Sequence, residues 1–116
     1  MGTFRGSRKY TIYSGNNVDE SKIFSWEFKV CSSVGANDEF LPYGTTISTA
    51  DLTALASDGT ATTSIFVGSE SLSNNVVSQK FTFPDEGVGT YTVYFKLTLD
   101  DGQVLNAEDR VYAEEL

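Results

Sequence analysis

The 116-residue sequence contains no histidine, one cysteine (Cys31), one methionine and two prolines. Zinc sites of the cysteine and histidine type, catalytic pairs with a histidine base, and haem or iron–sulfur centres all lack their usual ligands or base here. A single cysteine forms no intramolecular disulfide. We therefore expect no cofactor, and a fold that is stabilised by packing.

Long apolar runs are also missing. The start of the chain is positively charged without the apolar stretch of a secretory signal, and no segment approaches the roughly 20 apolar residues of a membrane-spanning helix. Apolar residues nevertheless make up 40% of the sequence and aromatic residues 13%, which is typical of a globular rather than a disordered chain. We expect one soluble domain with one core.

Charge is distributed unevenly along the chain, whose net charge is −8. Residues 1–18 contain Arg5, Arg8 and Lys9 and no acidic residue, whereas residues 19–116 contain 16 acidic residues against 5 basic ones. Affinity for phosphate backbones depends on lysine and arginine contacts, so an acidic body disfavours nucleic-acid binding. We expect neither a nucleic-acid nor a membrane partner.

The basic segment predicts a flexible arm. We assign residues 1–15 to a basic N-terminal arm that is partly disordered when free, and residues 16–116 to a single β-sandwich domain. Phe4 is the apolar anchor of the arm. An arm of this charge can order on contact with an acidic neighbour, including another copy of the same chain.

The clearest element is an alternating hairpin at residues 89–105. Apolar and polar side chains alternate from Tyr91 to Leu99, with the period of two that a half-buried antiparallel strand shows. Asp101 and Gly102 supply the residues of a tight turn, and QVLNAEDRVYA follows as the returning strand. This hairpin is expected to form the centre of a sheet.

Four other segments predict strands by their content of β-branched and aromatic residues: KIFSWEFKVCS, TATTSIFVGS, NNVVSQKFTF and RKYTIYS. In the first, Phe24, Trp26, Phe28 and Val30 are expected to point inward, and Ser25, Glu27, Lys29 and Cys31 outward.

The segment before residue 60 is ambiguous. Ser48 and Asp51 have the spacing of a capping box, and Leu52 and Leu55 follow at helical spacing, which favours one helical turn. A short strand over residues 45–48 followed by a loop fits equally well.

Five or six strands with turn signals between them indicate an antiparallel β-sandwich. Three features are similar to immunoglobulin-like domains: Tyr91 at the start of a late strand, Trp26 on an earlier strand, and Val93 where antibody domains place a cysteine. The expected fold class is thus all-β, an immunoglobulin-like antiparallel sandwich without a disulfide. We also expect its edges to be covered by a partner or guarded by charges such as Lys96 and Arg110.

Residues for catalysis are hard to find. Adjacent acidic pairs suit glycoside hydrolysis or calcium binding, but each pair lies at an expected turn or terminus, where acidic residues are common. A calcium loop near Asp100 and Asp101 stays open as an alternative. No nucleophile elbow, phosphate loop or dinucleotide fingerprint occurs, so we expect no enzyme, no catalytic residue and no metal site.

Exposed tyrosines and the arm form the candidate interface. Tyr94 and Tyr112 fall on the solvent-facing sets of two strands that should pair, and tyrosine is enriched where protein surfaces meet. A second aromatic layer under a loop is the alternative. The candidate partner-interface residues are Phe4, Arg5, Arg8, Lys9, Tyr10, Tyr13, Tyr94 and Tyr112.

The order of these features resembles the small immunoglobulin-like structural proteins of tailed bacteriophages, including the fiber-tail adaptor type. The likeness covers residues 22–113: a tryptophan-bearing strand, then YGTTIST, then ATTSIFVGSESLSNNVVSQKFTF, then GVGTYTVYFKLTLDDGQVLNAEDRVYA. It implies a non-enzymatic virion protein, assembled in the host cytoplasm, that contacts capsid, tail or fiber subunits in many copies. It would decorate or cement the capsid, or act as a head–tail or fiber adaptor.

Two other classes remain as alternatives. One is an immunoglobulin-like binding module of a bacterial surface adhesin or carbohydrate-recognition protein. The other is a small hydrolase, which would need two acidic groups held in one cleft with a raised pKa on one of them.

Overall fold

The computed structural model describes residues 5–12, 22–82 and 89–115, which form strands and one short 3-10 helix. The elements are β1 (Arg5–Ile12), β2 (Lys22–Glu27), β3 (Ile47–Ala56), η1 (Thr63–Ile65), β4 (Phe66–Ser73), β5 (Val76–Phe81), β6 (Gly89–Leu99) and β7 (Val104–Glu115). No helix in this part of the chain is long and apolar enough to cross a membrane.

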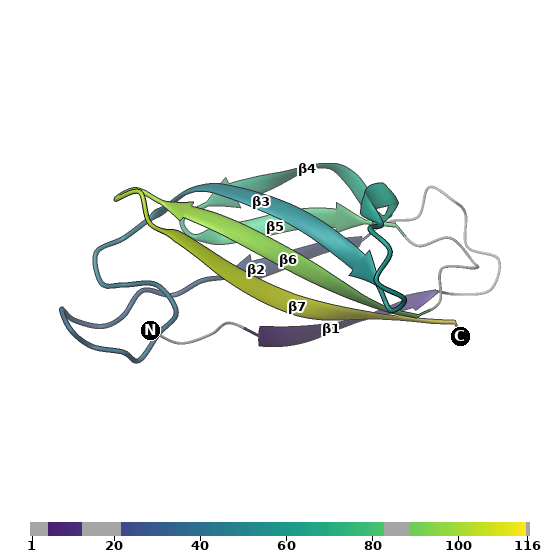
Figure 1. The fold of residues 1–116 in the computed structure, drawn as a ribbon, viewed down its shortest axis with the longest axis horizontal. Helices are drawn as coiled ribbons and strands as arrows, with labels where there is room; N and C mark the ends of the chain where they lie inside the picture. The colour runs from purple at the N-terminus through teal and green to yellow at the C-terminus, as the bar shows by residue number, and fades with distance from the viewer. Residues whose placement is uncertain (1–4, 13–21, 83–88, 116) are drawn as a thin grey trace.

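The strands form two layers (Figure 1). One sheet has the order β1-β7-β6-β3 and the other the order β2-β5-β4. Neighbours pair antiparallel except β1, which runs parallel to β7. In immunoglobulin domains the second, fifth and fourth strands share one sheet, and the third, sixth and seventh share the other. The same division occurs here, and the chain is an all-β, immunoglobulin-like sandwich, as the sequence predicted.

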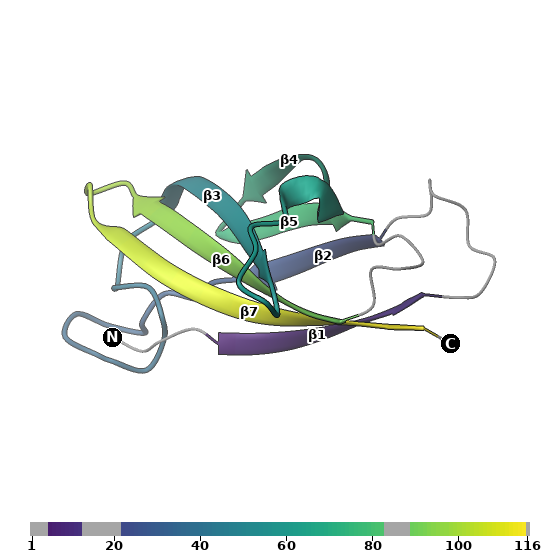
Figure 2. The same ribbon diagram turned by 45° about the vertical axis from the view of Figure 1, so that its right-hand side comes forward.

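The hairpin of β6 and β7 lies inside the four-stranded sheet, between β1 and β3 (Figure 2). Val93, Phe95 and Leu97 of β6 are buried, while Tyr94 and Lys96 are exposed, so the predicted alternation is confirmed. Gly102 has a φ of +90°, a left-handed conformation that glycine adopts without steric cost, and it closes the turn between the two strands.

Two charges expected to guard an edge lie elsewhere. Lys96 is on β6 and Arg110 on β7, and both strands have neighbours on each side. The prediction was wrong because sequence alternation gives the face of a strand and not its place in the sheet. The edges of the four-stranded sheet are β1 and β3.

The ambiguous segment forms β3, so the single helical turn was wrong and the short strand was too short. Along β3 the alternate residues Ala50, Leu52 and Ala54 are buried or half-buried against β6. A register shift between Ile47 and Thr49 interrupts the pairing at the start of the strand. Pairing of nine β3 residues with β6 outweighs the local preference for a helical turn that a capping box gives.

β4 also differs from its prediction. It begins at Phe66, after η1, and continues to Ser73, through residues that were expected to separate two strands. The turn to β5 is made by Asn74 and Asn75, which have φ values of 49° and 63°. Asparagine tolerates this left-handed conformation, and two such residues in succession suit a two-residue hairpin turn.

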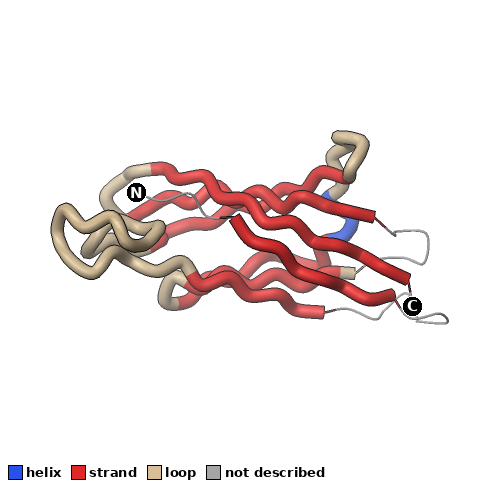
Figure 3. Tube along the Cα trace, turned by 90° about the horizontal axis from the view of Figure 1, so that it is seen from below, coloured by secondary structure: helices blue, strands red, loops and turns tan. Residues whose placement is uncertain are grey.

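β2 follows its predicted pattern only as far as Phe28. Phe24, Trp26 and Phe28 are buried, but Val30 is 38% exposed and Cys31 is 2% exposed, the reverse of the expected orientation. The strand ends at Glu27, and the chain then forms a bridge between Val30 and Leu41. Since the regular pleat stops there, alternation no longer predicts direction, and Cys31 lies inside a long loop between β2 and β3 (Figure 3).

Aromatic side chains dominate the core between the sheets. Trp26 has no exposed surface, and its ring centroid lies 4.8 Å from that of Phe95, 6.0 Å from Phe81 and 6.3 Å from Phe24, all at steep angles. Val93, at the position where antibody domains have a cysteine, is fully buried as well. Antibody domains carry their tryptophan on the third strand, whereas Trp26 is on the second, so only its burial matches the expectation.

The buried acidic residue Asp109 lies next to this cluster. It is 1% exposed, and the indole nitrogen of Trp26 donates a hydrogen bond to its Oδ2 atom. Buried carboxyl groups are costly unless they are hydrogen-bonded. The hydrogen bond links β2 of one sheet to β7 of the other across the core.

Candidate interaction surface

The solvent-facing side of the four-stranded sheet is the candidate functional surface, and we call it the outer face. Because side chains alternate along each strand, the residues between the buried ones point to this side. It combines two tyrosines with charged and amide side chains. Its exposed members include Asp51 and Thr53 from β3, Tyr94 and Lys96 from β6, and Asn106, Arg110 and Tyr112 from β7.

Both predicted tyrosines are exposed on this face. Tyr94 is 39% exposed and Tyr112 is 37% exposed, so their predicted orientation is confirmed. Tyr94 is aligned with Glu108 and Tyr112 with Thr90. The two tyrosines are therefore about four residues apart along the sheet, or about 14 Å at about 3.4 Å per residue, and they present two separate contact points.

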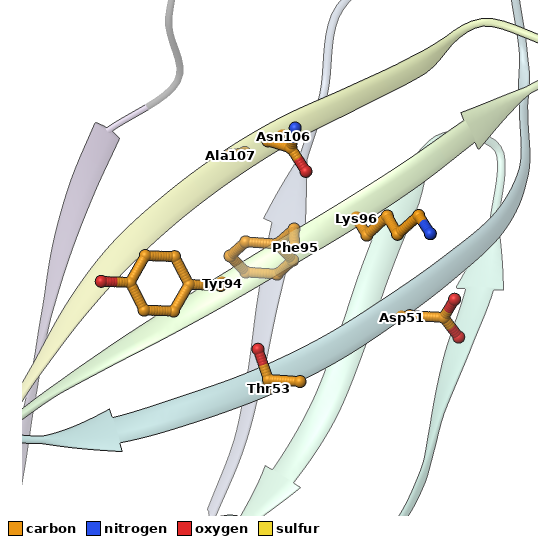
Figure 4. A pocket seen from close by; sticks show the side chains of 7 residues that line it. All are labelled: Asp51, Thr53, Tyr94, Phe95, Lys96, Asn106 and Ala107. Atoms are coloured by element: carbon orange, nitrogen blue, oxygen red, sulfur yellow. The ribbon is translucent and has the colours of Figure 1, made fainter. Parts of the chain in front are cut away.

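A hollow of about 310 Å³ lies beside Tyr94 (Figure 4). Its side-chain lining comes from three neighbouring strands, and two of the lining residues, Asp51 and Lys96, are aligned cross-strand partners of opposite charge. Such pairs contribute modestly to sheet stability and also present a donor and an acceptor to a ligand. The hollow is lined by Asp51, Thr53, Tyr94, Phe95, Lys96, Asn106 and Ala107.

Asp51, Thr53 and Asn106 were not predicted as site residues. The first two lie in the segment whose structure was left open, so their side could not be assigned from the sequence. The alternation of Ala50, Leu52 and Ala54 is the signal that would have placed them on the outer face.

The three-stranded sheet has a different outer surface. Its hollow of about 340 Å³ is lined mainly by serine side chains, together with Ile23 and Lys80. Ser25 and Ser78, aligned across β2 and β5, share a hydrogen bond of 2.8 Å between their hydroxyl oxygens. With no aromatic residue in its lining, this hollow offers a partner less apolar contact area than the hollow beside Tyr94.

The predicted arm is partly in contact with the same sheet. Residues 5–12 form β1, whose register places Arg5 beside Glu108, Arg8 beside Val111, Lys9 beside Tyr112 and Tyr10 beside Ala113. Phe4 and Tyr13 lie outside the described residues. Lys9 and Tyr112 are thus aligned on neighbouring strands near one edge of the sheet, and Arg5 lies four residues further along β1. Their role in an interface stays a prediction.

The described acidic pairs occupy turns or strands rather than a shared cleft. Asp101 accepts hydrogen bonds from the backbone nitrogen of Gln103 (3.0 Å) and from its side-chain nitrogen (2.6 Å). Asp100 accepts one from the backbone nitrogen of Thr46 at 3.2 Å. The Asp101 contacts are those of a turn-forming residue, and the Asp100 contact ties the turn to the residue before β3. Among the described residues no group of three or more histidine, cysteine or acidic side chains could hold a metal ion.

The pKa values of two exposed carboxyl groups are shifted, and both are lowered. Hydrogen bonds from Ser32 lower the pKa of Asp38, and hydrogen bonds from Thr60 lower the pKa of Asp58. A general acid for glycoside hydrolysis needs the opposite shift, toward neutrality. The pairs at residues 19–20 and 85–86 lie outside the described residues.

Tyr91, half-buried at the start of β6, gives the sandwich a pH-dependent contribution. Burial raises the pKa of its phenol above the ordinary value of 10.0, because desolvation disfavours the anion. The protonated phenol of Tyr91 therefore contributes to the stability of the folded state. This contribution is fully present below pH 10.0 and is lost as the pH rises through the folded-state pKa. We expect the denaturation midpoint of the wild type to fall more between about pH 9 and about pH 11.5 than that of Tyr91→Phe. Equal losses in the two proteins, measured by circular dichroism, would show that Tyr91 is not the group responsible.

Comparison with known proteins adds no family to this description. No family model matches the chain, and no curated protein matches it. Among solved structures the chain is similar to the I-band fragment I67-I69 from titin, at 15% identity and a TM-score of 0.41, over 97% of this chain and 31% of that one. The chain therefore spans about a third of that fragment. The immunoglobulin-like assignment rests on the strand order described above.

Proposed function

We propose that this protein is a non-enzymatic structural protein of a tailed bacteriophage virion. It decorates or cements the capsid, or joins head, tail and fiber parts, through contacts made by the outer face. The observation that carries the proposal is the pair of exposed tyrosines set among charged and amide side chains on one sheet face. Interfaces are enriched in tyrosine and surrounded by polar groups.

The residue order that resembles phage structural proteins supports the same proposal. Copies of a small sandwich assemble by symmetry, and such a role requires a contact surface rather than a catalytic group. On this proposal the partners are capsid, tail or fiber subunits, the chain is made and assembled in the host cytoplasm, and its final location is the virion. The net charge of −8 makes nucleic acid an unfavourable partner.

The first test is quantitative peptide mass spectrometry on density-purified particles from the source. Hundreds of copies per particle would indicate decoration of a shell, and a few copies a symmetric joint of the tail. Absence from every particle fraction would contradict the proposal.

Substitution on the outer face tests the contact itself. We expect Tyr94→Ala to weaken binding to purified particles by about 30-fold or more if Tyr94 is a central contact, which corresponds to about 2 kcal/mol. Tyr43, which is 54% exposed and lies in the loop before β3, gives the matched control Tyr43→Ala. The same affinity for both variants would remove Tyr94 from the interface.

A second candidate function is favoured by the hollow beside Tyr94. An aromatic ring next to carboxyl, amide and ammonium groups is an arrangement that can stack against a sugar ring and hydrogen-bond to its hydroxyl groups. This suits the immunoglobulin-like module of an adhesin or carbohydrate-recognition protein. Saturable binding of a glycan that is abolished by both Tyr94→Ala and Asn106→Ala, with no particle association, would favour this function over the first.

A further inference from the structure

Strand β1 is one of the four edge strands of the two sheets. It forms an edge of the four-stranded sheet and pairs with β7 alone (Figure 2). The next strand in the chain, β2, belongs to the opposite sheet. Residues 13–21 connect the two, and nine residues reach at most about 30 Å when extended. The pairing with β7 and the nine-residue connection to β2 are therefore what hold β1 in its position.

The pairing between β1 and β7 is also intrinsically weak. It is parallel, and parallel pairs are slightly less stable per residue than antiparallel ones. The strand includes Gly6, and glycine weakens a strand because it has no side chain to pack and loses more entropy on folding. Of the strand contacts that build the four-stranded sheet, this is the one that can be replaced at the lowest cost.

An aligned pair of opposite charges adds specificity to this contact. β1 contains Arg5, Arg8 and Lys9 and no acidic residue. β7 contains four acidic residues and one arginine, and its register aligns Glu108 with Arg5. Asp109 is buried against Trp26, and Glu114 and Glu115 are aligned with Thr11 and Ile12. Opposite charges on aligned strands attract each other and disfavour like-charged partners. At the aligned pair of Arg5 and Glu108 the edge of β7 is thus complementary to the basic strand that the chain itself supplies.

The geometry points to exchange of β1 between copies of this chain, so that the edge of β7 in one copy seats residues 5–12 of another. Every copy carries one donor strand and one acceptor edge, and the contacts are the same within a chain and between chains. Exchange of an identical element is a low-cost route to assembly, and it closes rings if the rotation closes or forms chains of subunits if it does not. It also keeps the β7 edge covered, as an exposed strand edge requires.

This inference rests on the proposed function, because both require the chain to bind other chains. It deepens that function by naming a second copy as the partner, β1 as the donor and the β7 edge as the acceptor. The outer face stays available for a different subunit.

Cross-linking between two differently labelled chains tests the exchange. Ser7 and Arg110 are aligned partners, and neighbouring strands are about 4.8 Å apart, within the Cα separation of about 4.4–6.8 Å that a disulfide spans. One chain carries Ser7→Cys and the other, with an isotope label, carries Arg110→Cys. The two are refolded together from denaturant at high concentration, oxidised, and measured by mass spectrometry of the intact disulfide-linked pair.

The matched control replaces Ser7→Cys by Ser69→Cys, on β4 of the other sheet, and reports random collision. A single chain with both Ser7→Cys and Arg110→Cys shows whether the two positions meet at all. We expect the mixed Ser7/Arg110 pair to cross-link at least about tenfold more than the control pair, a ratio of the size that a specific contact gives.

Two results would overturn the inference: a mixed pair that cross-links no more than the control, or a doubly substituted chain that forms no disulfide in any arrangement. Either result leaves particle association untouched, because the copy-number measurement above uses the unmodified chain. Conversely, cross-linked copies that are absent from every particle would leave the exchange standing and contradict the virion role.

Discussion

Trp26→Ala is expected to reduce the free energy of unfolding by about 3–5 kcal/mol, the range observed when a buried tryptophan or phenylalanine is truncated to alanine. Trp26 has no exposed surface and contacts the rings of Phe24, Phe81 and Phe95, which come from both sheets. Small domains are stable by only about 5–15 kcal/mol, so this variant should be close to unfolding at room temperature. Chemical denaturation followed by circular dichroism measures the change, since Trp26 is the single tryptophan and its fluorescence is lost.

Trp26→Phe separates ring packing from the hydrogen bond. Phenylalanine keeps an aromatic ring in the cluster but cannot donate to the Oδ2 atom of Asp109. Removing one partner of a buried hydrogen bond costs about 1–3 kcal/mol, so this variant should lie between the wild type and Trp26→Ala. Tyr43→Phe, at an exposed aromatic position, should change stability by less than about 0.5 kcal/mol. If Trp26→Phe is as stable as the wild type, the contact with Asp109 contributes nothing to holding the two sheets together.

The sequence predicted strands well where alternation was strong on both sides of a turn. The hairpin of β6 and β7 has a long alternating run that ends in Asp101 and Gly102, and both its turn and its buried face are confirmed. The pattern of β2 was followed only up to Phe28, because the rule of alternation holds while the strand is regular and this one ends at Glu27. Cys31 was consequently placed on the wrong side.

The outer face could be predicted only in part. Tyr94 and Tyr112 were identified because they alternate with core residues on the strongest hairpin. Asp51 and Thr53 were missed because their segment has local helical signals, and pairing with β6, far along the chain, decides its conformation. Which strands form the edges is likewise a property of the whole sheet, so Lys96 and Arg110 could not be located correctly from their neighbours in sequence.

Gln79 is a buried amide side chain whose role the sequence does not reveal. It hydrogen-bonds to the backbone where the pairing of β4 with β5 is interrupted. The pairing of β4 with β5 shifts between Val67 and Ser71, and Gly68 there has a φ of +72°. Gln79 is 2% exposed, and its side-chain nitrogen donates to the backbone oxygens of Gly68 at 3.1 Å and Lys80 at 3.0 Å. The side chain therefore supplies donors where the regular ladder is interrupted.

Gln79→Met should destabilise the protein by about 1–3 kcal/mol, because it leaves part-buried carbonyl oxygens without their donor while nearly conserving side-chain volume. Amide hydrogen exchange should accelerate along β4 more than along β6, since the interruption lies between β4 and β5.

Ser78→Ala, at the position next to Gln79, is the control. It removes one exposed hydroxyl group that is hydrogen-bonded to Ser25, and it should cost less than about 0.5 kcal/mol. If Gln79→Met unfolds at the wild-type denaturant concentration, water replaces the amide at these oxygens and the irregular strand does not depend on it. A loss of exchange protection confined to β4 would instead identify Gln79 as the residue that stabilises the irregular pairing of this edge strand. Irregular pairing of this kind keeps an exposed sheet edge from pairing with strands of other chains.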